Sequence, residues 1–134
     1  MQSNTQNAVI SKKMIWTGRI ISALPVLFLL MDGVMKLFKP RVVVEATVRL
    51  GYPESVIVGL GIVLLSCTVL YIISATSVLG AILLTGYLGG AVATHLRVGE
   101  GLFPEFFPII VGALIWGGLW LRDKRFRALV PLRR

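Results

Sequence analysis

An uncharged run of 42 residues, from Ser55 to Leu96, constrains this chain more than any other feature. One bilayer crossing by an α-helix takes about 20 apolar residues, so the run is long enough for two crossings. Near its middle, Ser74–Ser77 consists of small and hydroxyl-bearing residues, whose side chains bond to nearby backbone groups and favour a turn. The run therefore predicts a hairpin of two transmembrane helices, at 55–73 and 78–96.

Two further apolar segments flank this hairpin, at about 14–38 and 106–121. The earlier one contains Asp32 and Lys36, which need a protein or water environment within a membrane. No small-residue cleavage site follows its apolar core, so we interpret it as a retained helix and not as a signal peptide. The hydrophobic fraction of 56% and the mean hydropathy of +0.85 exceed the usual values of soluble domains. We therefore predict an all-α protein, an integral membrane four-helix bundle.

The basic residues lie at the ends of the apolar segments. Six of the fourteen follow the last predicted span, namely Arg122, Lys124, Arg125, Arg127, Arg133 and Arg134. Such clustering is typical of the cytoplasmic side of a membrane protein, and it argues against a nucleic-acid partner despite the net charge of +8. We expect both termini in the cytoplasm, with a flexible N-terminal segment at 1–13 and a basic tail at 122–134.

Small residues in the third predicted span indicate where helices pack against one another. Gly86 and Gly90 have the GxxxG spacing of closely packed membrane helices. A second stripe recurs every four residues, namely Ala81, Thr85, Gly89 and Ala93. The pattern predicts that this helix is central in the bundle, and the same stripe is also suited to the interface of a homo-oligomer.

Ionisable and hydroxyl side chains gather at one end of the predicted bundle. With four antiparallel spans, the end of the first, the end of the third and the start of the fourth meet on the same side. The candidate ligand-binding residues there are Asp32, Lys36, Tyr87, His95, Arg97 and Glu105. Asp32 and Lys36 are four residues apart with the acid first, the favourable order for an ion pair within a helix. The pair either neutralises itself or contacts a ligand, and the sequence leaves both possibilities open.

His95 and Asp32 are the candidate catalytic residues, because an imidazole beside a carboxylate can transfer protons. The alternative for His95 is a structural one, in which it only caps the end of its helix. It is the sole histidine, and Cys67 is the sole cysteine, so we expect no metal site and no disulfide.

The loop between the first two spans carries two signals. Gly51–Glu54 has the composition of a turn with an aromatic residue in it. The preceding segment, 42–50, predicts a short interfacial helix over the polar cluster. This helix is a candidate lid.

Three motifs resemble the DoxX-like family of small four-helix membrane proteins. They are DG followed by KL at 32–37, LGA at 79–81 leading into TGYLGGAVATHLR at 85–97, and WGGLWLRD at 116–123. The resemblance extends over nearly the whole chain, from Arg19 to Arg127. It implies a link to quinone-coupled oxidoreductases. Nothing in the residues supplies a flavin, haem or cysteine centre, so we expect no covalently bound cofactor, and any redox chemistry would need a partner subunit or a diffusible substrate such as a quinone.

Three functions are compatible with these observations. The first is binding of a lipophilic small molecule, such as a quinone, at the polar cluster, either alone or as an accessory subunit of an oxidoreductase. The second is a structural or assembly subunit without catalysis, and the third is a membrane-embedded acid/base enzyme acting on a lipid. The expected partners are the lipid bilayer and either an oxidoreductase subunit or a second copy of the chain. We expect the protein in a bacterial inner (plasma) membrane.

Overall fold

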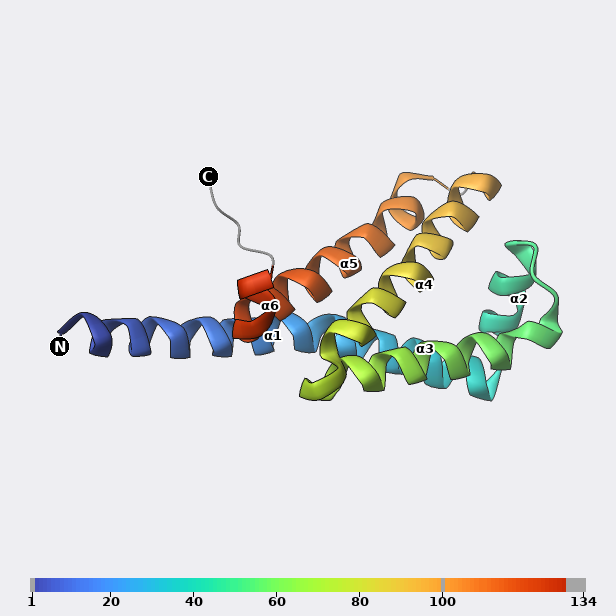
Figure 1. Cartoon of the computed structure of the whole chain (residues 1–134). Coiled ribbons are helices and arrows are strands. Elements are labelled where there is room, and N and C mark those ends of the chain that lie inside the picture. The colour runs from blue at the N-terminus through green and yellow to red at the C-terminus, as the bar shows by residue number, and fades with distance from the viewer. Residues whose placement is uncertain (1, 100, 130–134) are drawn as a thin grey trace.

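The computed structural model describes residues 2–99 and 101–129, with side chains from Lys12 onward (Figure 1). In order, its helices are α1 (Gln2–Phe38), α2 (Arg41–Arg49), η1 (Glu54–Val56), α3 (Ile57–Ile72), η2 (Ser74–Thr76), α4 (Ser77–Val98), α5 (Leu102–Arg122) and α6 (Lys124–Leu129). Four of them contain segments long and apolar enough to cross a membrane, namely Lys12–Phe38, Glu54–Ile72, Ser74–Val98 and Leu102–Arg122. The predicted all-α fold with four membrane-spanning helices is confirmed, although α1 begins at Gln2 and not near Met14.

Large apolar side chains cover the outside of the bundle. On α1 they form a stripe at Ile20, Leu24, Leu27 and Met31, each between 55% and 66% exposed. The spacing of four, three and four residues keeps this stripe on one face of the helix. A surface of this kind is stable against hydrocarbon and not against water. The described chain is therefore an integral membrane protein.

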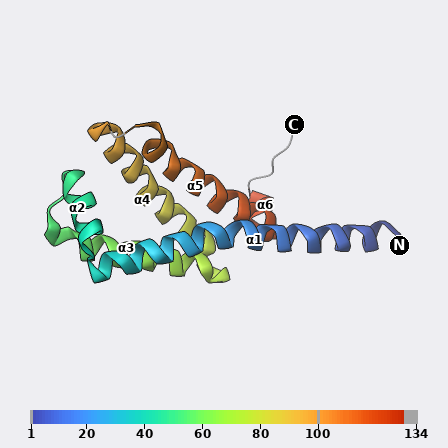
Figure 2. The same ribbon diagram turned by 180° about the vertical axis from the view of Figure 1, so that it is seen from behind.

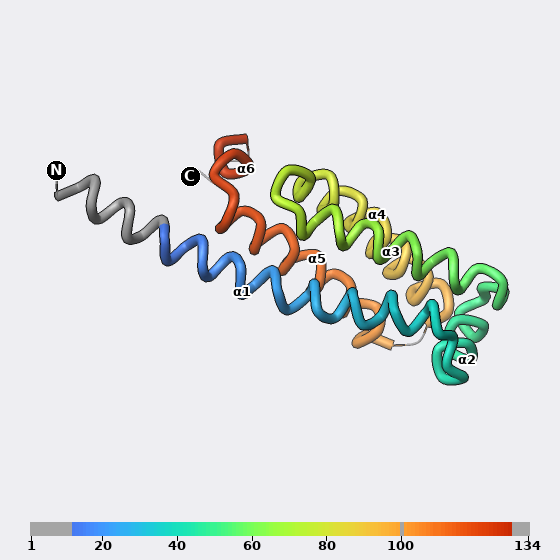
Figure 3. Tube along the Cα trace, turned by 90° about the horizontal axis from the view of Figure 1, so that it is seen from below, coloured from blue at the N-terminus to red at the C-terminus, as the bar shows by residue number. Residues whose placement is uncertain are grey.

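The four long helices form a closed ring of contacts. α1 packs against α3 and α5, and α4 packs against the same two helices. The α1–α3 pair and the α4–α5 pair diverge toward the end where α2 lies, so that the ribbon has the shape of a V in Figure 1 and, from behind, in Figure 2. Figure 3 shows the four helices running nearly alongside one another when seen from below. In the described part of the chain each long helix packs mainly against two of the others, α4 no more than the rest, so the prediction that the third span is central is wrong.

The closest helix contacts involve glycines outside the predicted GxxxG pair. A Cβ atom added at Gly18 would lie 2.7 Å from the carbonyl oxygen of Gly118, and one added at Gly61 would lie 2.9 Å from that of Gly33. In contrast, a Cβ added at Gly86 or Gly90 would meet nothing within 4 Å. The predicted use of Gly86 and Gly90 for close packing is therefore wrong, because these residues face open space.

The apolar core lies between the two helix pairs, toward the closed end of the V. Its fully buried members include Leu29, Leu64, Tyr71, Leu84, Ile115 and Leu119. The short α6 folds back onto this end, where the Phe126 ring lies 5.3 Å from that of Trp116. Part of the predicted tail is thus helical and packed, whereas Arg133 and Arg134 lie outside the described residues.

The orientation in the membrane remains a prediction and has a direct test. In a Cys67→Ala background, Val42→Cys on α2 and Ala128→Cys on α6 would place single thiols at exposed positions at opposite ends of the bundle. If the basic end is cytoplasmic, a membrane-impermeant maleimide applied to intact cells should label Val42→Cys and should reach Ala128→Cys only after permeabilisation. The reverse pattern would show that the topology is inverted.

Candidate functional site

A cavity of about 480 Å³ opens between the arms of the V, at the end where α2 lies. Every helix of the ring contributes to its wall, and α2 closes one side. Most of the lining is apolar and comes from residues such as Phe28, Leu29, Leu60, Phe107 and Val111. The rings of Phe28 and Phe107 meet edge to face at 5.0 Å, which joins α1 to α5 at the cavity wall. The cavity is thus a mainly apolar pocket within the membrane-spanning part of the protein.

One wall of the cavity carries an ion pair. The Lys36 Nζ atom lies 2.6 Å from the Asp32 Oδ2 atom, a short, charge-assisted hydrogen bond across one turn of α1. The Lys36 side chain is 14% exposed and that of Asp32 is 34% exposed. Because both groups line the cavity, they are the fixed charges that a bound molecule would meet there.

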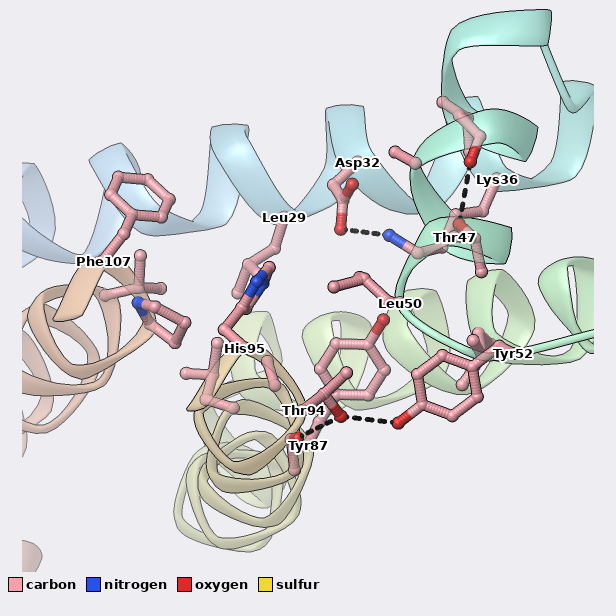
Figure 4. Close-up of a pocket in the computed structure, with 18 of the residues that line it drawn as sticks. Leu29, Asp32, Lys36, Thr47, Leu50, Tyr52, Tyr87, Thr94, His95 and Phe107 are labelled. Atoms are coloured by element: carbon pink, nitrogen blue, oxygen red, sulfur yellow. Dashed lines mark hydrogen bonds and ion pairs between the residues drawn. The ribbon is translucent and has the colours of Figure 1, made fainter. Parts of the chain in front are cut away.

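Tyr87 and His95 face the cavity from α4, two turns apart on the same helix (Figure 4). Figure 4 shows Tyr87 on the wall opposite Asp32 and Lys36, and His95 beside Leu29 on the side toward Phe107. Among the residues that the structure describes, the phenol of Tyr87 has no hydrogen-bond partner. A phenol can both donate and accept a hydrogen bond, so Tyr87 offers an unused polar group to a ligand.

Hydrogen bonds to α4 hold the turn after α2, and with it α2, over the cavity. The Tyr52 hydroxyl lies 2.7 Å from the Thr94 Oγ1 atom. The Thr94 hydroxyl in turn donates to the Gly90 carbonyl at 2.8 Å. The Arg97 Nη2 atom donates to the Leu50 carbonyl at 2.8 Å. The predicted short helix at 42–50 is confirmed as α2 at Arg41–Arg49, and it lines the cavity with its inner face.

The structure brings four of the six predicted ligand-binding residues to one cavity, namely Asp32, Lys36, Tyr87 and His95. The other two lie elsewhere. Arg97 is outside the lining and anchors the turn after α2, and Glu105 lies in the first turn of α5, also outside the lining.

Sequence reasoning missed several lining residues, because a cavity is made by the divergence of helices and not by any one of them. Thr47, Tyr52, Thr94, Gly86 and Gly90 all face it. Small residues such as Gly86 and Gly90 can leave space for a ligand, so the sequence did contain a sign of the cavity. Their spacing, however, fits a helix-packing motif equally well. No group of three or more His, Cys, Asp or Glu residues is close enough to hold a metal ion within the described part of the chain.

A comparison with protein families supplies an independent observation on this chain. The model of the DoxX-like family matches residues 20–118, which contain the cavity and most of all four spans. The chain belongs to the DoxX-like family. Comparisons with curated proteins and with solved structures found no match. Membership in the DoxX-like family agrees with the four-helix membrane fold and leaves the ligand of the cavity to be inferred from its chemistry.

Proposed function

We propose that this DoxX-like protein binds a lipophilic small molecule with a polar head, specifically a quinone, in the cavity between its two helix pairs. The observation that carries this proposal is the cavity itself, about 480 Å³ of mainly apolar space with an ion pair and a phenol on opposite walls. Small-molecule sites typically have about 300–1,000 Å³, apolar walls and a few fixed polar groups. The site has each of these properties.

The polar groups suit the two carbonyl oxygens of a quinone head. The Lys36 ammonium has three N–H donors, of which one engages Asp32. It can therefore donate a second hydrogen bond to a carbonyl, while the phenol of Tyr87 can donate one from the opposite wall. The Phe28 and Phe107 rings line the apolar part of the cavity, where an isoprenoid or alkyl chain fits.

The source of electrons would lie outside this chain. One cysteine and one histidine cannot provide the ligands of an iron–sulfur cluster or a bis-histidine haem. We therefore propose that the protein acts with an oxidoreductase partner subunit in a bacterial plasma membrane, and that its own part is to hold the quinone.

Two adjacent glycines provide a matched test of this proposal. Gly90 lines the cavity, whereas Gly89 does not, and a Cβ added at either would meet nothing within 4 Å. Both Gly90→Leu and Gly89→Leu should therefore fold, helped by the higher helix propensity of leucine. We expect Gly90→Leu to fill the cavity and lower the affinity for decylubiquinone at least tenfold, and Gly89→Leu to leave it unchanged. Quenching of intrinsic fluorescence by decylubiquinone in nanodiscs measures both affinities.

The same pair of variants addresses the alternative of an assembly subunit. Gly89 and Ala93 are exposed on the outer face of α4, where small residues would let a partner helix approach closely. If Gly89→Leu releases a co-purifying protein and Gly90→Leu does not change decylubiquinone binding, the proposed quinone site is wrong and the outer face of α4 is the functional surface.

A further inference from the structure

A second, smaller groove lies at the end of the bundle remote from the cavity that Asp32 and Lys36 line. It has a volume of about 190 Å³ and runs between α1 and α3, ending at the last residue of α5, Arg122. Its lining combines polar and apolar residues. Arg19, Ser22, Tyr71 and Arg122 form the polar part, and Ala23, Val26 and Ile72 form the apolar part. A groove with both charged and apolar walls suits a molecule with a polar head and a hydrocarbon chain.

A chain of hydrogen bonds holds the Arg122 guanidinium in place at this groove. The Tyr71 hydroxyl donates to the Ile115 carbonyl at 2.6 Å, so in the 3.0 Å contact between Ser22 and Tyr71 the serine must be the donor. The Arg122 Nε atom then donates to the Ser22 Oγ atom at 3.1 Å, and its Nη2 atom donates to the Tyr71 carbonyl at 3.3 Å. The guanidinium also lies 4.8 Å from the centre of the Tyr71 ring.

These contacts order the cation before any ligand arrives. Ser22 is buried, so the Arg122 side chain cannot swing away without removing the N–H group that donates to the buried Ser22 Oγ atom. A guanidinium has five N–H donors in a rigid fork that matches phosphate. A preordered arginine loses less conformational entropy on binding an anion.

Arg122 also lines a neighbouring cleft of about 220 Å³, so the groove and the cleft share this residue. The cleft is further lined by Ser74, Ser77, Asp123, Lys124 and Arg125. Among the described lining residues Asp123 is the one acidic member, and its carboxylate accepts hydrogen bonds from the backbone N–H groups of Arg125 and Phe126 at 2.9 and 3.2 Å. The Arg125 Nε atom lies 3.9 Å from the same carboxylate. With Arg19, the region presents four basic side chains against one carboxylate, and it therefore attracts anions.

Aromatic side chains place this region at the level of lipid headgroups. Arg19 lies 5.3 Å from the centre of the Trp16 ring, and Arg127 lies 5.9 Å from that of Trp120. Tryptophan beside arginine at the end of a membrane span is characteristic of the membrane–water interface. The anionic groups that a bilayer supplies at that depth are those of lipid headgroups, chiefly their phosphates.

We propose that Arg19, Arg122 and Lys124 bind the phosphate of an anionic phospholipid, one of whose acyl chains lies in the groove along Ala23, Val26 and Ile72. The site is separate from the quinone cavity and does not depend on the function proposed for it. If the phospholipid binds there, the bundle prefers anionic over zwitterionic lipid at one defined place, between α1 and α3. This preference is additional to the general attraction of anionic lipid to the net positive charge of the protein.

The test compares lipid binding by the full chain and by two double variants with equal loss of charge. Native mass spectrometry in detergent, with phosphatidylglycerol and phosphatidylcholine of the same acyl chains, gives the preference for the anionic lipid. Arg19→Gln/Lys124→Gln removes two cations of the site and leaves Arg122 to hold the helices together. Arg41→Gln/Arg49→Gln removes two cations from α2, at the other end of the bundle.

Each basic residue near a phosphate contributes about fivefold in affinity for anionic lipid. We therefore expect Arg19→Gln/Lys124→Gln to reduce the preference for phosphatidylglycerol about 25-fold, and Arg41→Gln/Arg49→Gln to change it less than twofold. Ala23→Phe, which blocks the apolar part of the groove, should weaken phosphatidylglycerol binding without affecting the binding of inorganic phosphate. Equal losses in the two double variants, or no preference in the unmodified chain, would overturn the proposed site.

Discussion

Gly80→Val should lower the free energy of unfolding by about 3 kcal/mol or more, the upper range for forcing extra atoms into a packed core. A Cβ at this position would lie 2.6 Å from the Cα atom of Tyr71, within the backbone of α3. Backbone atoms at the turn between α3 and α4 cannot rotate away as a side chain can. The whole hairpin would have to open, and with it the core around Tyr71, which is fully buried. Titration with sodium dodecyl sulfate in mixed micelles measures the change.

Gly89→Val on the same helix is the matched control. It makes the same chemical change at an exposed position where a Cβ meets nothing within 4 Å, so both variants share the change in helix propensity. We expect Gly89→Val to be as stable as the unmodified protein or slightly more stable, since glycine is the poorer helix former. Equal stability of the two variants would show that α3 and α4 do not approach as closely as the structure has them.

The contrast between Gly80 and Gly86 shows how far the sequence could predict this fold. Hydropathy alone indicated the four spans, because crossing a bilayer imposes a length and an apolar composition on each helix separately. Spacing also indicated a stripe of small residues. It did not indicate which small residues touch a neighbour, since that depends on the angle at which two helices cross. Gly80 belongs to no GxxxG pair in the chain and still makes the closer contact.

The candidate site was predictable to a similar degree. Antiparallel topology was enough to bring Asp32 near His95, because it fixes which helix ends meet. The divergence of the two helix pairs, which creates the cavity, is a property of tertiary packing and left no periodic signal. For the same reason Arg97 could not be distinguished from Lys36, although one anchors the turn after α2 and the other faces the cavity.

Lys36→Met should lower the free energy of unfolding by about 2 kcal/mol, because it leaves the Asp32 carboxylate in a mainly apolar cavity without its cation. Removal of one partner from a fully buried pair costs about 3–5 kcal/mol, and Asp32 is one third exposed, which reduces the effect. The double variant Asp32→Asn/Lys36→Met has no unpaired charge and should regain most of the lost stability. The same detergent titration, applied to each single variant and to the double, measures the coupling between the two residues.

The double variant also separates the two roles that the sequence left open for this pair. If the pair only neutralises itself, a stable neutral replacement will bind decylubiquinone as the unmodified protein does. If Lys36 donates a hydrogen bond to the quinone head, the double variant will be stable and yet bind at least tenfold more weakly, since a hydrogen bond from a charged donor contributes about 1.5–3 kcal/mol. We expect the second result, because the ion pair faces the cavity across from the phenol of Tyr87. Unchanged binding by a stable double variant would remove Asp32 and Lys36 from the site and leave Tyr87 and His95 as its polar groups.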